Sequence, residues 1–144
     1  MTLTPQPLTP LVQAWLDLWN GDMRRAETVI APDFTMHAAM MDGSDSNAMR
    51  GPQALVGWIT QTRSIAHDML FEIEVGPIQQ DDLIALNWQV TGHYAGGFPG
   101  ATAPLGTLVQ FTGTDTLRVR GEQLAEYWVN ASMYVMLAQL KVGV

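Results

Sequence analysis

Three segments in the first half of the chain carry hydrophobic residues at helical spacing. The first starts at Thr9-Pro10, a pair typical of a helix N-terminus, and its apolar face consists of Leu11, Ala14, Trp15, Leu18 and Trp19. The pattern then predicts a second helix over residues 23–30, stopped by Pro32, and a short strand over residues 34–37. Gly51-Pro52 opens a third helix, after a stretch without period that we expect to form a loop.

From residue 69 onward the hydrophobic spacing changes to two, which is typical of strands with one buried face. A first strand follows residue 68, and a turn over residues 79–82 leads into a long strand over residues 83–94. In that strand one face carries Ile84, Leu86, Trp88, Val90 and Tyr94, and the other carries Asn87, Gln89, Thr91 and His93. A Gly- and Pro-rich connection over residues 95–104 precedes a third strand over residues 107–119. The turn Gly121-Glu122 joins it to a fourth over residues 123–130, before a tail of helix-forming residues.

Helices that precede a run of long antiparallel strands indicate an α+β fold. A sheet of such long strands must twist and curl, and helices on its concave side would leave a cone with an internal pocket. We therefore expect a single domain over residues 1–144: a cone-shaped barrel of a strongly curved, mainly antiparallel sheet with three N-terminal helices covering the pocket. The three prolines in the first ten residues indicate that residues 1–9 form a loose arm.

The charge pattern limits the kinds of partner that the protein can bind. Seven basic and fourteen acidic residues give a net charge of -7, which argues against binding to nucleic acid or to an anionic membrane. Only 15% of the residues are charged, and so little surface charge favours a homodimer or higher homo-oligomer. The absence of cysteine excludes thiolate chemistry and disulfide scaffolds. No apolar stretch is long enough to span a membrane and the N-terminus does not resemble a signal peptide, so we expect a cytoplasmic protein.

One acidic residue breaks the alternation of the third strand. Asp115 falls on the apolar face between Phe111 and Leu117, while the opposite face is a row of threonines. Burial of a carboxylate usually raises its pKa, and a carboxyl that titrates near neutrality suits general acid–base chemistry. The alternative is a structural carboxylate that accepts hydrogen bonds from a core group, such as an indole N–H or Arg118.

The turn at Gly121-Glu122 predicts a second carboxylate beside the first. If these two residues form the turn, Arg120 pairs with Gln123 and Asp115 faces Trp128. Glu126 would then share the face of Asp115, diagonally adjacent at roughly 7–8 Å. A slip of the hairpin by one residue would instead place Glu126 on the other face, in a structural or exposed position.

Several motifs along the chain together resemble one family. They are Trp19-Asn20-Gly21-Asp22, residues 31–37 (APDFTMH), Arg50-Gly51-Pro52, residues 88–92 (WQVTG), residues 96–100 (GGFPG), residues 113–118 (GTDTLR) and residues 124–128 (LAEYW). In order and spacing they look like the SnoaL-like polyketide cyclases of the nuclear-transport-factor-two-like superfamily. The resemblance implies a conical α+β barrel with a deep pocket, usually assembled as a dimer or higher oligomer.

The resemblance also implies site residues. The family's G-x-D-x-x-R aspartate, the acid/base of a cofactor-free intramolecular aldol closure, falls on Asp115. Family members carry a histidine at the end of the long strand, after W-x-x-x-G-x; here that position is Tyr94, which can donate a hydrogen bond to a carbonyl or enolate. His37 matches the histidine that closes the family's first-strand motif, and it would either face the pocket or be a satisfied rim histidine.

Two functions from different classes follow. The first is an enzyme that transfers protons next to a carbonyl of an apolar, polyketide-like molecule, by aldol-type cyclisation or isomerisation. It would need no metal or organic cofactor, and its catalytic residues would be Asp115, Tyr94 and His37. The substrate would contact Trp15, Trp19, Trp58, Trp88, Phe98, Glu126 and Trp128. The second is a non-catalytic module that binds a small apolar molecule or serves for dimerisation. An epoxide hydrolase similar to the limonene enzyme ranks last, because it needs a second aspartate beside Asp115 and Arg118.

Overall fold

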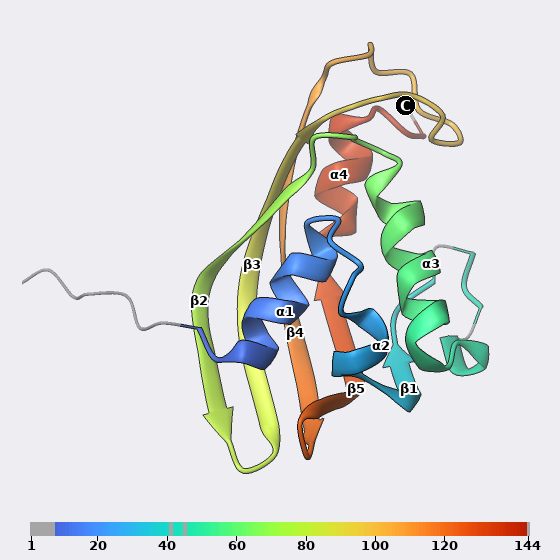
Figure 1. Ribbon diagram of the computed structural model, residues 1–144. Helices are drawn as coiled ribbons and strands as arrows, with labels where there is room; N and C mark the ends of the chain where they lie inside the picture. Colours follow the sequence, from blue (N-terminus) through green and yellow to red (C-terminus); the bar gives the residue numbers. More distant parts are fainter. Residues whose placement is uncertain (1–7, 41, 45, 144) are drawn as a thin grey trace, which may run out of the picture.

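The computed structural model describes residues 8–40, 42–44 and 46–143, so most of the expected N-terminal arm lies outside the described residues. Helices and strands follow one another as the hydrophobic pattern predicts, in an α+β fold (Figure 1). The helices are α1 (Pro10–Trp19), α2 (Ala26–Val29), η1 (a 3-10 turn, Ser46–Ala48), α3 (Gly51–Arg63) and α4 (Met133–Gln139). The strands are β1 (Ile30–His37), β2 (Leu70–Gln80), β3 (Leu83–His93), β4 (Leu108–Arg120) and β5 (Gln123–Ala131).

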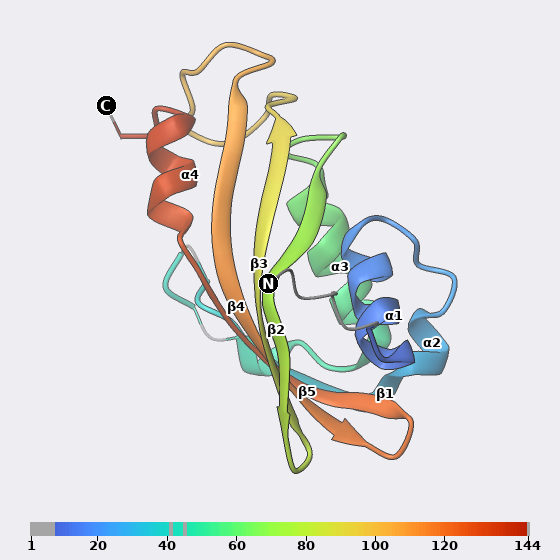
Figure 2. The same cartoon turned by 90° about the vertical axis from the view of Figure 1, so that its left-hand side faces the viewer.

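The five strands form one mixed sheet in the order β1-β5-β4-β3-β2. β1 runs parallel to β5, and the other neighbours are antiparallel. The sheet is strongly twisted and curved, and the helices lie on one side of it (Figures 1 and 2). The closed barrel that we expected is not observed among the described residues, where β1 and β2 are the free edges. α1 contacts β2, α3 contacts β1, and the two helices contact each other, so helices close the cone between these edges.

The helices agree with the sequence pattern except near Pro32. Thr9 caps α1, its hydroxyl accepting from the backbone N–H of Val12 at 3.3 Å. The second helix has only four residues, and β1 already begins at Ile30. The predicted bounds of both elements are therefore wrong, because Pro32 lies inside an edge strand, where its missing N–H is tolerated. In the described part of the chain, no helix has the length and apolar character needed to cross a membrane.

Two polar side chains attach the end of α1 to the start of β2. The Asn20 amide donates to the carbonyl oxygen of Phe71 at 3.1 Å and accepts from its N–H at 2.8 Å. The Arg63 guanidinium, from α3, donates to the carbonyl oxygens of Trp19 and Met69 at 2.9 and 2.7 Å. These bonds hold the rings of Trp19 and Phe71 together, with centroids 5.1 Å apart. The Trp-Asn-Gly-Asp segment thus joins the first helix to the sheet.

A glycine opposite a tryptophan makes room in the middle of the sheet. Gly113 on β4 pairs with Trp88 on β3, and the indole of Trp88 lies across the space that a side chain at 113 would occupy. A Cβ at this position would overlap ring atom Cζ2 and lie 2.7 Å from Cε2 and Cη2. A buried ring cannot yield that much space without moving, because protein interiors are close-packed.

Replacing Gly113 with alanine should therefore destabilise the protein, although alanine is usually the better residue in a strand. We expect a loss of about 2 kcal/mol in the free energy of unfolding, measured by urea denaturation, since overpacking typically costs 1–3 kcal/mol. Gly57→Ala is the matched control: Gly57 lies in α3, is exposed, and has no atom within 4 Å of its would-be Cβ. That variant should gain roughly 0.5–1 kcal/mol. Unchanged stability of Gly113→Ala would contradict this account of the register.

Candidate functional site

Asp115 lies on the buried face of β4, as the alternation predicts, and is only 3% exposed. Its Oδ2 accepts a hydrogen bond from Trp15 Nε1 at 3.0 Å, and its Oδ1 accepts one from Trp88 Nε1 at 2.8 Å. The two indoles come from α1 and β3, so the carboxyl joins helix and sheet. Structural hydrogen bonds from indoles, the alternative considered above, are therefore present. Asp115 also lines the large cavity of the molecule, so the structural bonds do not isolate it from a ligand.

Burial raises the pKa of Asp115 from 3.8 to about 6. Hydrogen bonds from Trp15, Trp88 and the Tyr127 hydroxyl act in the opposite direction, because they stabilise the charged form. The same neighbourhood raises the pKa of Tyr127 well above its ordinary value, through burial and the adjacent negative charge. The result is a carboxyl that changes charge near neutral pH beside a phenol that stays protonated.

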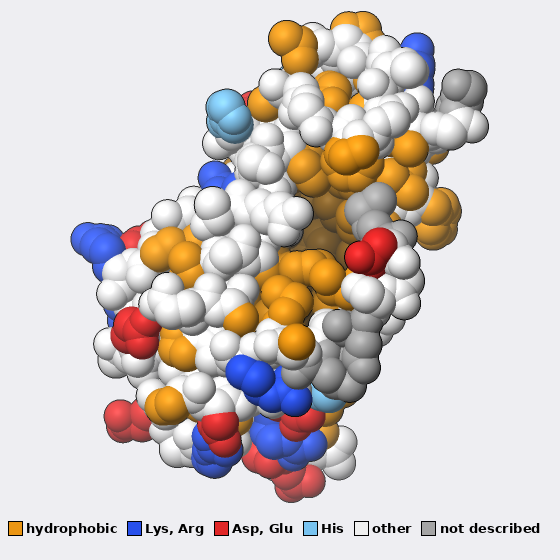
Figure 3. Space-filling model, turned by 90° about the vertical axis from the view of Figure 1, so that its right-hand side faces the viewer, with side chains coloured by type: hydrophobic (Ala, Val, Ile, Leu, Met, Phe, Trp, Pro, Cys, Tyr) orange, Lys and Arg blue, Asp and Glu red, His pale blue; other side chains and the backbone are white. Residues whose placement is uncertain are grey.

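The cavity has a volume of about 680 Å³, within the usual range for small-molecule sites. Its mouth opens on the helical side of the molecule, and its walls are mostly hydrophobic (Figure 3). Residues of α1, α3, α4, the inner face of the sheet and the Gly-rich connection line it. The aromatic members of the lining are Trp19, Trp58, Phe71, Trp88, Phe98, Phe111 and Tyr127.

The structure brings together many of the residues predicted as walls. Trp19, Trp58, Trp88 and Phe98 line the cavity. Trp15 lies behind this wall, buried against Tyr127 with ring centroids 4.7 Å apart, and reaches the site only through its bond to Asp115.

The predicted hairpin register is correct at the turn and wrong beyond it. Arg120 pairs with Gln123 and Val119 with Leu124, but Arg118 then pairs with Glu126, which leaves Ala125 as an extra residue in a β-bulge. The bulge reverses the facing of every later side chain of β5. Glu126 therefore points away from Asp115, and Tyr127 takes the inward position. Tyr127, Phe71 and Phe111 are the aromatic cavity residues that the sequence interpretation did not name as walls.

On the outer face Glu126 belongs to a chain of hydrogen-bonded polar side chains. Its Oε2 lies 2.7 Å from His37 Nε2, and its Oε1 accepts from Arg118 Nε at 3.0 Å. Arg118 Nη1 continues to Asp82 at 2.8 Å. Partial burial raises the pKa of Glu126, but the bonds from His37 and Arg118 outweigh it and hold the pKa below its usual value. Glu126 is therefore a charged structural group.

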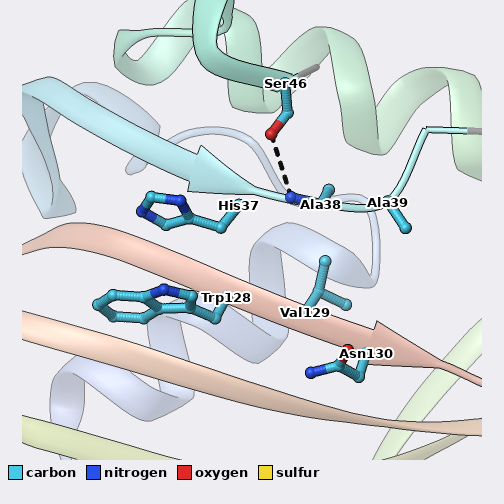
Figure 4. A pocket seen from close by; sticks show the side chains of 7 residues that line it. All are labelled: His37, Ala38, Ala39, Ser46, Trp128, Val129 and Asn130. Carbon is cyan, nitrogen blue, oxygen red and sulfur yellow. Dashed lines mark hydrogen bonds between the residues drawn. The ribbon is translucent and has the colours of Figure 1, made fainter. Parts of the chain in front are cut away.

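His37 and Trp128 lie beside each other at a second, shallower hollow (Figure 4). Their rings stack with centroids 5.0 Å apart and 13° between planes, and the Arg118 guanidinium lies 5.6 Å from the Trp128 ring centroid. Neither His37 nor Trp128 lines the large cavity. His37 ends β1 on the same face as Glu126 and bonds to it, which agrees with the alternative of a satisfied rim histidine and not with a position in the large cavity. The bulge turns Trp128 to that face, so its predicted place in the cavity wall is incorrect.

Tyr94 takes part in positioning a loop and does not line the cavity. It follows the last residue of β3, is buried, and its hydroxyl accepts from the backbone N–H of Phe98 at 2.9 Å. Its own N–H donates to the carbonyl oxygen of Thr107 at 2.8 Å, on the far side of the Gly-rich connection. Tyr94 therefore anchors the loop that presents Phe98 to the cavity.

Trp19 carries an unusual polar atom. Its indole Nε1 is buried and has no hydrogen-bond partner among the residues that the structure describes. An unpaired buried N–H typically costs about 1–3 kcal/mol, and a phenylalanine would avoid that cost. Within the same part of the chain, no group of three or more His, Cys, Asp or Glu side chains is arranged to hold a metal ion.

Solved structures of known proteins share this architecture. IdmH from Streptomyces antibioticus, a proposed polyketide cyclase, is 26% identical with a TM-score of 0.77, covering 92% of this chain and 96% of that one. A proposed polyketide cyclase from Acidithiobacillus ferrooxidans is 20% identical with a TM-score of 0.78, covering 91% of both chains. AclR from Streptomyces galilaeus, a proposed hydroxylase, is 20% identical with a TM-score of 0.74, covering 93% of this chain and 81% of that one.

No curated protein matches the chain in sequence. The family model described as SnoaL-like polyketide cyclase matches residues 9–140, which include every helix and strand of the fold and both hollows described above. The chain therefore belongs to the SnoaL-like polyketide cyclase family.

Proposed function

We propose that the protein is an enzyme in which Asp115 transfers protons next to a carbonyl of an apolar small molecule. The observation that carries the proposal is a single buried carboxyl, with a pKa raised to about 6, in the wall of an aromatic cavity. A base with such a pKa is substantially ionised at neutral pH yet accepts a proton more readily than an exposed aspartate. Membership in a family of polyketide cyclases supports the same class of reaction.

In the reaction, ionised Asp115 takes a proton from the carbon next to the carbonyl, and the electron pair of that C–H bond forms an enolate. The enolate carbon then attacks a second carbonyl carbon of the same molecule in a cyclisation, or is reprotonated elsewhere in an isomerisation. Protonated Asp115 returns its proton to the new alkoxide or carbon, so the carboxylate is regenerated. The apolar walls would exclude water from the enolate.

The enolate oxygen needs a hydrogen-bond donor, because proton removal places negative charge on it. Tyr94 was the sequence-based candidate, but it does not line the cavity. The Tyr127 hydroxyl already donates its one proton to Asp115, so the remaining candidate is the indole N–H of Trp19, which has no partner among the described residues and would meet the ligand once this buried ring turns toward the cavity. Trp19 packs directly on Trp15, with ring centroids 6.1 Å apart, and Trp15 in turn donates to Asp115.

Asp115→Asn should remove the base with a side chain of the same size, whose amide oxygen can still accept one of the two indole hydrogen bonds. We expect proton transfer to fall by roughly 100-fold or more, within the usual contribution of a general base. The measurement is deuterium exchange at the carbon next to the carbonyl of aromatic bicyclic ketones such as 2-tetralone, followed by NMR in D₂O. Glu126→Gln is the control, because that carboxylate lies on the outer face and should leave exchange unchanged. Equal exchange rates in Asp115→Asn and the parent protein would refute the proposal.

The raised pKa of Asp115 also has a consequence for stability. The unfolded chain loses this proton near pH 3.8 and the folded protein near pH 6, so folding favours the protonated form. The contribution of Asp115 to stability therefore falls as the pH rises between these values, by about 3 kcal/mol in total. The free energy of unfolding of Asp115→Asn, measured in urea, should rise by this amount relative to the parent protein from about pH 4 to about pH 7. Glu126→Gln should change in the opposite direction, because the folded pKa of Glu126 is lowered.

Trp19→Phe tests the indole donor. The ring remains but the N–H is removed, so the exchange rate of bound ketone should fall roughly 10- to 100-fold with little change in KM, since the bond strengthens as the enolate forms. Trp58→Phe is the matched control: Trp58 lines the same cavity and is partly exposed. An equal loss in both variants would indicate that ring size matters and that the Trp19 N–H has no role.

A second candidate function is a binding module without chemistry. The observation in its favour is that both oxygens of Asp115 already accept an indole hydrogen bond, as a structural carboxylate would. Thermal stabilisation by a ketone that shows no exchange would favour this module over the enzyme.

A further inference from the structure

The charges around the large cavity have one sign. Two carboxylates line it, Asp115 in the wall and Asp42 in the segment after β1. No Lys, Arg or His side chain belongs to the lining within the described residues. The whole chain carries a net charge of -7, so the long-range field acts in the same direction.

Among the residues that the structure describes, Asp115 has hydrogen-bond donors but no counter-ion. Trp15, Trp88 and Tyr127 stabilise its charge, and all three are neutral. The partly buried guanidinium of Arg63 is directed to two backbone carbonyls, and Arg118 belongs to the outer face with Glu126. When Asp115 is ionised, its negative charge is therefore screened by dipoles alone, and a cation in the cavity would lower its energy.

The remaining walls suit a cation that has a low hydration energy. The faces of aromatic rings attract positive charge, most strongly for tryptophan, and the attraction is larger where water is excluded. Trp19, Trp58 and Trp88 all line the cavity, with four further aromatic rings beside them. Anions would instead meet both the negative faces of these rings and two carboxylates.

We infer that the large cavity is a binding site for organic ammonium ions, which the aromatic walls enclose and the carboxylate of Asp115 neutralises. Alkyl groups on nitrogen make the cation apolar enough to enter such a site, and the volume of about 680 Å³ accommodates an aryl or polycyclic substituent as well. The inference goes beyond proton transfer, because it requires only that Asp115 be charged. An ammonium ion bound there would compete with a ketone for the same space.

Three probes of nearly equal shape separate the effect of ligand charge on affinity from the effect of ligand size. Phenyltrimethylammonium, tert-butylbenzene and benzenesulfonate carry a tetrahedral group with charge +1, 0 and −1 on the same ring. We expect the cation to bind the parent protein at least tenfold more tightly than the neutral probe, and the anion to bind most weakly, by calorimetry or competition. The N-methyl protons of the bound cation should shift upfield in NMR, because they lie over aromatic rings.

Two variants then test which carboxylate gives the cavity its preference for the cation. Asp115→Asn should reduce affinity for the cation about tenfold or more and leave tert-butylbenzene binding unchanged, which also shows that the cavity is intact. Asp42→Asn should have a smaller effect, because Asp42 is exposed. The inference fails if the cation does not bind measurably, binds no better than the neutral probe, or keeps its affinity in Asp115→Asn. These outcomes are independent of deuterium exchange, so the enzyme proposal can fail while ammonium binding holds, and the reverse.

Discussion

The buried carboxyl of Asp115 is the constraint around which the rest of the interior is arranged. A carboxylate away from water must have its oxygens satisfied, and here the donors come from α1 and β3. Trp88 can lie flat on the sheet because Gly113 has no side chain. Trp15 reaches β4 because Asn20 and Arg63 hold the end of its helix against β2. Gly113 and Asn20, which belong to different elements, thus both help to place an indole donor against the carboxyl of Asp115.

The sequence pattern predicts much of this arrangement for a physical reason. Strands with one buried face alternate strictly, so one acidic residue in phase with Phe111 and Leu117 is conspicuous, and the structure places Asp115 on the buried face. The first helix and its cap at Thr9 were equally predictable, because a capping hydroxyl, a proline and an apolar stripe are local signals. The long strands could be delimited for the same reason.

Features that depend on one inserted residue or on distant contacts could not be predicted. The bulge at Ala125 exchanges the faces of Glu126 and Tyr127, and no local signal in residues 123–130 separates a regular hairpin from a bulged one. The parallel pairing of β1 with β5 joins segments about 90 residues apart, and it brings His37 to Glu126 on the outer face. The alternation correctly places Tyr94 in the core. The partner of its hydroxyl, the backbone N–H of Phe98, lies in a loop without a hydrophobic period and could not be predicted.

Because the donors around Asp115 are neutral, the same carboxyl can act as a base and as the counter-ion of a bound cation. An arginine or lysine at hydrogen-bond distance would lower its pKa, as His37 and Arg118 do for Glu126, and would leave a weak base. Without any donor, burial alone would raise the pKa of the carboxyl further. Two indoles and a phenol lie between these limits: they stabilise the anion enough to bring its pKa to about 6, and they add no positive charge. Among the described residues no positively charged side chain lines the cavity, so a ligand can balance the charge of Asp115, either by giving it a proton or by bringing a cation.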